Sequence, residues 1–243
     1  MLAQLIVTAV AAPSGAAPRT SGVDAAEAAA ERDRRWHAGI GIGADIPVDA
    51  LNVGFVIQAP SGLRLSSSVG FLTDVFLGLM DDGDQAASVM HAALRNSVVW
   101  RTHLGVKPWN THGFYAAAGY SLCSFGGAIT SGAAISVLLD RMLPVDLGSD
   151  SVVHMSSTLH ALDLEAGWEW SIARHFTVRT AIGAAMVLAA STSLQIDAGS
   201  LAFLPTDQLI APVERAGEAE INARYKQAGP IVMLTVQLQV DLL

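Results

Sequence analysis

Through most of the chain, hydrophobic and polar residues alternate with a period of two. In the segment 36–46, for example, Ile40 and Ile42 alternate with Gly39 and Gly41. Successive side chains of a β-strand point to opposite faces of the sheet, so this alternation predicts strands with two unlike faces. The segments have about the 9–11 residues that a tilted strand needs to cross a bilayer. The eight predicted strands are 36–46, 51–59, 63–72, 97–107, 113–122, 162–170, 175–186 and 232–242.

The two faces of these strands differ in side-chain size as well as in polarity. One face has no charged residue and holds the bulky aromatic residues Trp36, Trp100, Trp168, Trp170, Phe55, Phe71, Phe114 and Phe176. The other face is rich in glycine, with Gly39, Gly41, Gly43, Gly54, Gly70, Gly105, Gly119, Gly167 and Gly183. Aromatic volume on this scale does not fit a small lumen, whereas glycine suits a narrow interior in which strands curve. We therefore expect a closed barrel with its apolar face outward. The opposite polarity would give a soluble, exported binder of the lipocalin kind.

Charged residues on the glycine-rich face are nearly balanced in sign. Because buried charges are tolerated when they are paired, we expect these side chains to form a network inside the barrel. An eight-stranded barrel is filled by side chains, which predicts a plugged lumen rather than a wide channel. The histidines His37, His103 and His175 have the same phase and are expected to join the hydrogen bonds of the lumen. The predicted lumen charge network comprises Arg64, Arg101, Lys107, Arg179, Asp45, Asp163, Glu165 and Glu169.

The connections between the predicted strands are short at one end of the barrel and mostly long at the other. The turns 59–62, 108–112 and 171–174 are short, whereas the linkers 73–96, 123–157 and 191–229 are long and only 47–50 on that side is short. An aromatic girdle is predicted at the short-turn end, where Trp36, Trp109, Trp168 and Trp170 fall. Helix-like pieces, expected to cap the barrel mouth, occur in the long linkers at 84–95, 132–142 and 207–226, the last expected to be interrupted by Pro212.

The N-terminus differs from the rest of the chain. Residues 1–12 are apolar, uncharged and end in small residues, so 1–17 is predicted to be a signal peptide. Residues 18–35 are expected to form a linker to a barrel domain at 36–243. Beyond the N-terminus, the best apolar run is 181–190, which is shorter than the roughly 18 residues of a transmembrane helix.

Composition narrows the class of protein. Charged residues make up 15% of the chain, against about 25% in ordinary soluble domains. Hydrophobic residues reach 51% and the mean hydropathy is +0.42, which excludes disorder and argues against an ordinary cytosolic enzyme. The net charge of −8 and the scattered Lys and Arg argue against a nucleic-acid partner. The single cysteine, Cys123, permits no internal disulfide.

The alternating segments, the glycine-rich inner face and the unequal connections resemble the small eight-stranded outer-membrane β-barrels of Gram-negative bacteria. The resemblance covers Trp36 to Leu242 and rests on pattern, without a diagnostic motif. It implies an all-β fold: an eight-stranded antiparallel transmembrane up-and-down barrel with short periplasmic turns and long external loops. The implied partners are outer-membrane lipid, lipopolysaccharide and the barrel assembly machinery. Such barrels commonly end on an aromatic residue, whereas this chain ends in Leu242-Leu243.

The sequence contains no recognisable catalytic motif, metal-ligand spacing or cofactor fingerprint, so we predict no catalytic residue, metal or cofactor. The expected function is a structural, adhesive or recognition role at the cell surface, with no ligand named by the residues. A second hypothesis is an outer-leaflet lipid-modifying hydrolase, because His154 and Ser156 could form a base and nucleophile pair. The acids Glu165 and Glu169 have the opposite phase, so an acid would have to come from elsewhere. A third hypothesis is a passage for small hydrophobic solutes through the loop cap.

Overall fold

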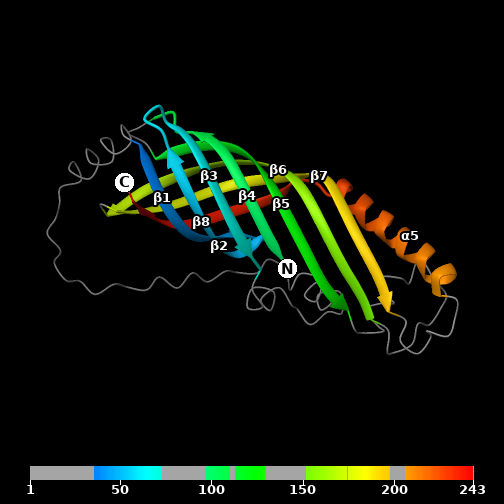
Figure 1. Ribbon diagram of the computed structural model, residues 1–243. Helices are drawn as coiled ribbons and strands as arrows, with labels where there is room; N and C mark the ends of the chain where they lie inside the picture. Colours follow the sequence, from blue (N-terminus) through cyan, green and yellow to red (C-terminus); the bar gives the residue numbers. More distant parts are fainter. Residues whose placement is uncertain are drawn as a thin grey trace, which may run out of the picture.

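The computed structural model describes residues 36–72, 97–109, 113–129, 152–173, 175–197 and 206–242. Within these ranges eight strands pair in sequence order, each antiparallel to the next, and the last strand pairs with the first (Figure 1). The predicted all-β fold, a closed eight-stranded antiparallel barrel, is confirmed. The elements are β1 (His37–Ile46), β2 (Asp49–Gln58), β3 (Leu63–Phe71), β4 (Val98–Val106), β5 (Phe114–Ile129), β6 (Val152–Ala173), β7 (Phe176–Asp197), α5 (Thr206–Gln227) and β8 (Ile231–Asp241).

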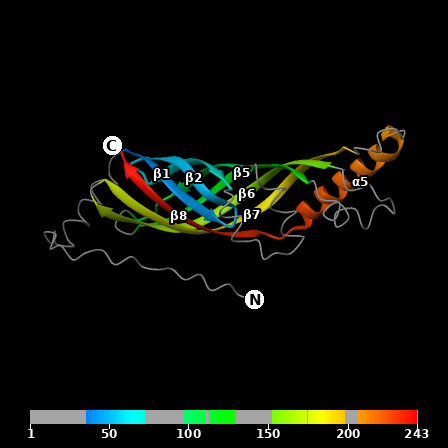
Figure 2. The same cartoon turned by 90° about the horizontal axis from the view of Figure 1, so that it is seen from below.

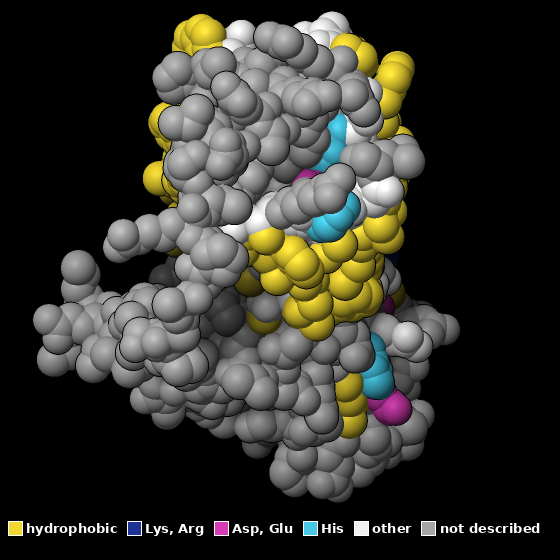
Figure 3. All heavy atoms as spheres, turned by 90° about the vertical axis from the view of Figure 1, so that its left-hand side faces the viewer, with side chains coloured by type: hydrophobic (Ala, Val, Ile, Leu, Met, Phe, Trp, Pro, Cys, Tyr) yellow, Lys and Arg dark blue, Asp and Glu magenta, His cyan; other side chains and the backbone are white. Residues whose placement is uncertain are grey.

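The polarity of the wall is the one that the alternation predicts. Trp168, Ile182 and Leu234 are 48%, 64% and 47% exposed, whereas Arg101 is 3% exposed. Figure 3 views the molecule from the left-hand side of Figure 1, and hydrophobic side chains gather there on the part of the surface that is not drawn in grey. The apolar side chains therefore cover the exterior of the barrel, and the charged side chains lie inside it.

Strands β5, β6 and β7 continue beyond their neighbours. The first residue of β4, Val98, pairs with Ser124 of β5, and the first residue of β8, Ile231, pairs with Ala185 of β7. Past these pairs the three strands run on as a sheet, with α5 alongside (Figures 1 and 2). We refer to this part as the extension; it comprises residues 125–129 of β5, 152–160 of β6, 187–197 of β7, and α5.

The extension corrects the predicted linkers 123–157 and 191–229, since parts of both belong to strands. The predicted limits coincide with the end of the outward apolar residues, but the strands continue because their inward residues still pack. Val153 and Leu194, for example, are 4% and 5% exposed. The outward positions of the extension are mostly small or polar, so apolar alternation does not mark these parts as strands.

A β-bulge in β7 separates the extension from the barrel. His160 pairs with Ala189 while Ala161 pairs with Val187, which leaves Leu188 as the extra residue. A bulge of this kind reverses the phase of the strand. Odd-numbered residues of β7 point inward before the bulge and even-numbered residues point inward after it.

Helix α5 occupies most of the connection between β7 and β8. The helix predicted at 207–226 is present, and its last turn carries Arg224 and Lys226, where cations interact favourably with the helix dipole. Its buried positions include Val213 and Gly217. None of the helical structure in the described ranges is long and apolar enough to span a membrane.

Several predicted segments lie outside the described residues. These are the signal peptide at 1–17, the linker at 18–35, and the helices at 84–95 and 132–142.

Candidate functional site

The lumen is crossed by ion pairs between strands that are not neighbours. Near the short-turn end, Glu169 of β6 accepts a hydrogen bond from Arg64 of β3. The ammonium Nζ of Lys107 lies 3.7 Å from Oε2 of the same carboxylate. At the same end, His37 Nε2 lies 3.1 Å from Oδ1 of Asp241. The Glu169 contacts join β6 to β3 and to the end of β4 across the lumen, whereas the contact of His37 with Asp241 joins the neighbouring strands β1 and β8.

Tyr115 of β5 occupies the centre of this half and is completely buried. The guanidinium carbons of Arg64 and Arg179 lie 4.8 Å and 4.9 Å from its ring centroid, so two cations contact one aromatic ring. Arg179 also donates to the Tyr115 hydroxyl and pairs with Glu165. A Cβ at Gly167 would lie 2.8 Å from the Tyr115 hydroxyl oxygen, so glycine makes room for the ring.

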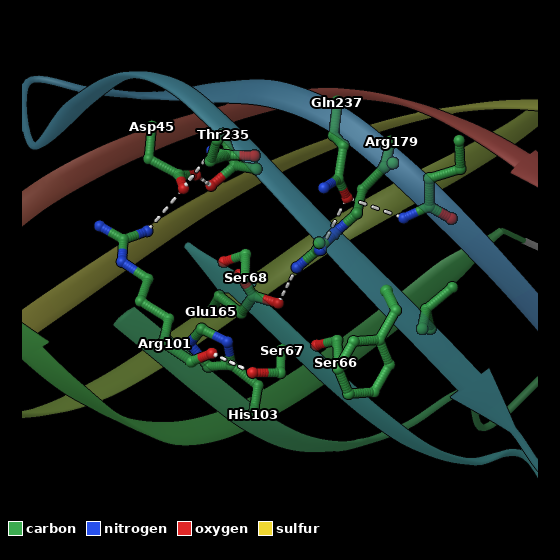
Figure 4. Close-up of a pocket in the computed structure, with 16 residues that line it drawn as sticks. Asp45, Ser66, Ser67, Ser68, Arg101, His103, Glu165, Arg179, Thr235 and Gln237 are labelled. Atoms are coloured by element: carbon green, nitrogen blue, oxygen red, sulfur yellow. Dashed lines mark hydrogen bonds and ion pairs between the residues drawn. The ribbon is translucent and has the colours of Figure 1, made fainter. Parts of the chain in front are cut away.

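A second cluster fills the half toward the long connections. Arg101 NH1 lies 2.8 Å from Asp45 Oδ2 (Figure 4). Arg101 Nε also lies 3.9 Å from Asp163 Oδ2. His103 Nε2 lies 3.5 Å from the same Asp163 oxygen, to which Ser121 also donates. One guanidinium therefore links acids from β1 and β6.

Two acids in this cluster lie close together and share a donor. The Asn52 amide nitrogen donates to Asp45 Oδ2 at 2.8 Å and to Asp49 Oδ1 at 3.0 Å. The backbone N–H of Asp45 also donates to Asp49 at 3.1 Å. Hydrogen bonds to both carboxylates offset part of the repulsion between them.

The structure brings all eight residues of the predicted charge network into the lumen. Sequence reasoning placed His37 and His103 there as well, but His175 lies exposed in the β6–β7 turn, so its predicted lumen position is wrong. Two residues were missed. The sequence predicts Asp49 in the connection 47–50, although β2 begins with it, and Tyr115 faces inward although the other bulky aromatics are predicted to face outward. The only available signal for Tyr115 was its phase, which it shares with Gly119.

The side chains leave little free space between them. The cavity lined by Asp45, Arg101, Glu165 and Arg179 among others has a volume of about 20 Å³ (Figure 4). A cavity needs about 10–15 Å³ to hold one water molecule, so there is room for about one or two. In the part of the lumen that the structure describes, ion pairs and hydrogen bonds form a filled core.

An apolar layer closes the lumen at the side of the extension. Val99, Cys123 and Leu159 form a buried cluster, against which Phe125 of β5 and Tyr225 of α5 pack. Helix α5 thus contributes a side chain to the seal above the polar network.

Polar groups on the outward face of the barrel are paired with each other. The Trp100 indole N–H donates to Ser67 Oγ at 3.0 Å. The Ser67 hydroxyl also lies 3.0 Å from the Arg101 carbonyl oxygen and 3.1 Å from Thr102 Oγ1. These groups satisfy one another without requiring water.

The four tryptophans of the predicted girdle all lie on the outside at or beside the short-turn end. Trp36, Trp109, Trp168 and Trp170 are 65%, 56%, 48% and 49% exposed. Phe114 connects two of them, since its ring centroid lies 5.7 Å from that of Trp109 and 5.0 Å from that of Trp168.

The outward face of the extension contains a hollow. It has a volume of about 340 Å³ and is lined by Gly127, Ala128, His154, Met155, Ser156, Ser193 and Gln195. Of the lining residues on β6 and β7, His154, Ser156, Ser193 and Gln195 are exposed and Met155 is half-buried, in keeping with an open, shallow site.

His154 and Ser156, the pair behind the hydrolase hypothesis, both line this hollow. Glu165 and Glu169 are engaged in the lumen with Arg179 and Arg64. None of the described residues that line the hollow carries a carboxylate, although Asp197 is the next outward residue of β7 after Gln195. The described residues also contain no group of three His, Cys, Asp or Glu side chains that could hold a metal ion.

Comparison with known proteins gives similarity in structure only. No family model matches the sequence, and no curated protein matches it. The N-terminal β-barrel domain of Pseudomonas aeruginosa OprF is similar at 10% identity with a TM-score of 0.40, over 86% of this chain and 98% of that chain. Acinetobacter baumannii CarO2 is similar at 14% identity with a TM-score of 0.42, over 85% of this chain and 97% of that chain.

Proposed function

We propose that this protein is a non-enzymatic outer-membrane β-barrel of a Gram-negative bacterium. The filled barrel anchors the chain in the membrane, and the extension performs a structural, adhesive or recognition role at the cell surface. The residues predicted to form a signal peptide, 1–17, would direct export, and the barrel assembly machinery would insert the chain.

The height of the apolar exterior carries this proposal. On β6 the outward apolar positions run from Leu162 to Ile172, which is about 33 Å along a strand at about 3.3 Å per residue. With the tilt of about 40° that is usual in outer-membrane barrels, this length corresponds to a belt about 25 Å tall. Such a belt matches the hydrocarbon thickness that these barrels span.

Two further observations support a lipid environment. In the barrel wall outside the extension, the charged side chains of the strands point inward, and the outward hydroxyls of Ser67 and Thr102 are hydrogen-bonded to each other. In hydrocarbon an unpaired polar group costs several kcal/mol, so internal pairing is what a lipid-facing wall requires.

The orientation follows from the connections. Outer-membrane barrels have short turns on the periplasmic side and longer connections outside. This rule puts the extension outside the cell, in contact with lipopolysaccharide. It puts the girdle of Trp36, Trp109, Trp168 and Trp170 at the periplasmic headgroups.

The filled lumen favours an anchor over a transport role. A cavity of about 20 Å³ is too small for a solute, so passage of hydrophobic molecules through the barrel would require Tyr115 and its partners to move.

The test is extraction and reconstitution of the full chain. We expect the protein to require detergent and to migrate faster on a gel when unheated, because closed barrels stay folded in detergent. In liposomes, phospholipids brominated on their acyl chains should quench the fluorescence of outward tryptophans such as Trp100. Purification without detergent, together with no quenching, would refute the membrane assignment and favour a soluble exported binder.

A further inference from the structure

The outward face of the extension, together with the adjoining Ser124 of β5, is a grid of small and hydrogen-bonding side chains on three adjacent strands. In the antiparallel register Ser156 of β6 lies between Gly126 of β5 and Ser193 of β7. Neighbouring strands are about 4.8 Å apart, so the side chains of one row lie close together. The three rows, in the order β5, β6, β7, are Ser124–Thr158–Ser191, Gly126–Ser156–Ser193 and Ala128–His154–Gln195.

The chemistry of this grid is neutral and rich in donors and acceptors. Its nine residues supply five hydroxyl groups, one amide and one imidazole, and none of them is Lys, Arg, Asp or Glu. On β5, Gly126 and Ala128 have little or no side chain, which leaves the neighbouring polar groups accessible from that side. The resulting hollow of about 340 Å³ falls at the lower end of the range of ligand sites, about 300–1,000 Å³.

The grid continues directly from the apolar belt along the same outward face. On β6 the outward residues change from Leu162 to His160 and then to Thr158. At this boundary the Tyr120 hydroxyl is hydrogen-bonded to His160 Nδ1, and the ring centroids of these two residues lie 6.0 Å apart. A lipid whose acyl chains lie against Leu162 would therefore hold its polar head toward the grid.

We propose that the grid binds the saccharide portion of the glycolipid that surrounds the barrel in the outer leaflet. This inference rests on the proposed function, because it takes its ligand from the membrane that the belt spans. Sugar hydroxyls are neutral donors and acceptors, which matches the side chains of Ser156, Ser193 and Gln195. Phosphate groups are recognised mainly by Arg and Lys, which the grid lacks.

Binding is tested with the full chain folded in detergent micelles. The probe is the core oligosaccharide released from lipopolysaccharide by mild acid, titrated calorimetrically. Removing two facing hydroxyls in Ser156→Ala/Ser193→Ala should weaken binding about tenfold, because each lost hydrogen bond costs part of the binding energy. Ser193→Trp should abolish binding by filling the hollow. The control Glu220→Gln lies on the exposed side of α5 and should bind as the wild type does.

Folding of each variant is checked by circular dichroism, and the two serine variants act differently, since one removes hydroxyl groups and the other fills the hollow. Wild-type protein that does not bind the oligosaccharide would overturn the proposal, as would serine variants of unchanged affinity. Full competition by inorganic phosphate, or equal affinity for a plain glucose oligomer, would also overturn it. If the protein inserts into liposomes but does not bind the saccharide, this inference is wrong and the proposed function still holds. Failure to insert would contradict the proposed function instead.

Discussion

The Glu218 carboxylate of α5 accepts a hydrogen bond from the backbone N–H of Leu194 in β7, with 2.9 Å between Oε1 and N. One turn earlier in the helix, Glu214 accepts from the N–H of Ile196 at 2.8 Å. Four residues of a helix rise about 6 Å and two residues of a strand rise about 6.6 Å, so the two spacings match. Helix α5 therefore runs antiparallel to β7 and covers an edge that has no strand partner beyond Ala185 in the register with β8.

Removing both carboxylates should release this edge. In Glu214→Ala/Glu218→Ala the N–H groups of Leu194 and Ile196 lose charged acceptors, each worth about 1.5–3 kcal/mol. We expect faster hydrogen exchange at these two amides and cleavage of α5 by protease, with the barrel still folded. The control Glu220→Ala removes an exposed ion pair with Arg224 and should change neither measurement.

Close approach of α5 to β7 should make Gly217 intolerant of a side chain. Replacing glycine by alanine within a helix normally stabilises the helix by about 1 kcal/mol. At Gly217 the new Cβ would lie 2.6 Å from Cδ1 of Leu194, so Gly217→Ala should instead loosen α5 and increase its proteolysis. Gly229→Ala, which lies beyond the end of α5 and has no atom within 4 Å, is the control for a glycine-to-alanine change without a clash. Greater protection in Gly217→Ala would show that Leu194 yields easily.

Removing an acidic side chain from the lumen should lower the stability of the barrel. Glu169→Ala leaves Arg64 and Lys107 without their shared carboxylate, and breaking a buried pair costs about 3–5 kcal/mol. The measurement is unfolding in urea of the protein in lipid. The double variant Arg64→Met/Glu169→Gln removes both charges of the closer pair and should recover part of the loss. A double variant less stable than Glu169→Ala would contradict the pairing.

Tyr115 should contribute through its ring more than through its hydroxyl. Tyr115→Phe keeps the ring between Arg64 and Arg179 and loses one hydrogen bond, so we expect a loss of about 1 kcal/mol. Tyr115→Ala removes the ring and should cost about 3–5 kcal/mol, as for other large aromatics in cores. Planar-bilayer recordings should also show ion conductance in Tyr115→Ala but not in Tyr115→Phe. Equal stability of the two variants would refute a central role for the ring.

A charge on the belt should separate a lipid-facing wall from a water-facing one. Ile182 is 64% exposed, so Ile182→Arg would cost little in water but about 2–4 kcal/mol at the middle of a membrane. Ser191→Arg, on the outward face of the extension, should cost about 0–1 kcal/mol. The readout is the free energy of unfolding from liposomes. Equal values for the two variants would count against a membrane-spanning belt.

The sequence was sufficient to predict the wall of the barrel because the two faces of each strand meet different surroundings. Outward residues such as Leu234 and inward residues such as Arg179 differ strongly in polarity. The alternation with a period of two therefore predicts which residues face outward and which face inward. The same alternation placed the charged residues inside. It could not pair them, since Arg101 contacts Asp45 only because β1 and β4 curve toward each other across the lumen.

The sequence by itself therefore determined the strands of the barrel, their polarity and the population of its lumen, because these depend on residues that are near one another in the chain. Tertiary structure alone decided the partners within the lumen, the position of Tyr115 among them, and the whole of the extension. In the extension the bulge at Leu188 reverses the phase of β7. The edge of β7 that has no strand partner is covered by side chains of α5, which begins at Thr206. No periodic pattern in the sequence predicts this cap, because the acceptor carboxylates belong to α5 and the donor N–H groups belong to β7.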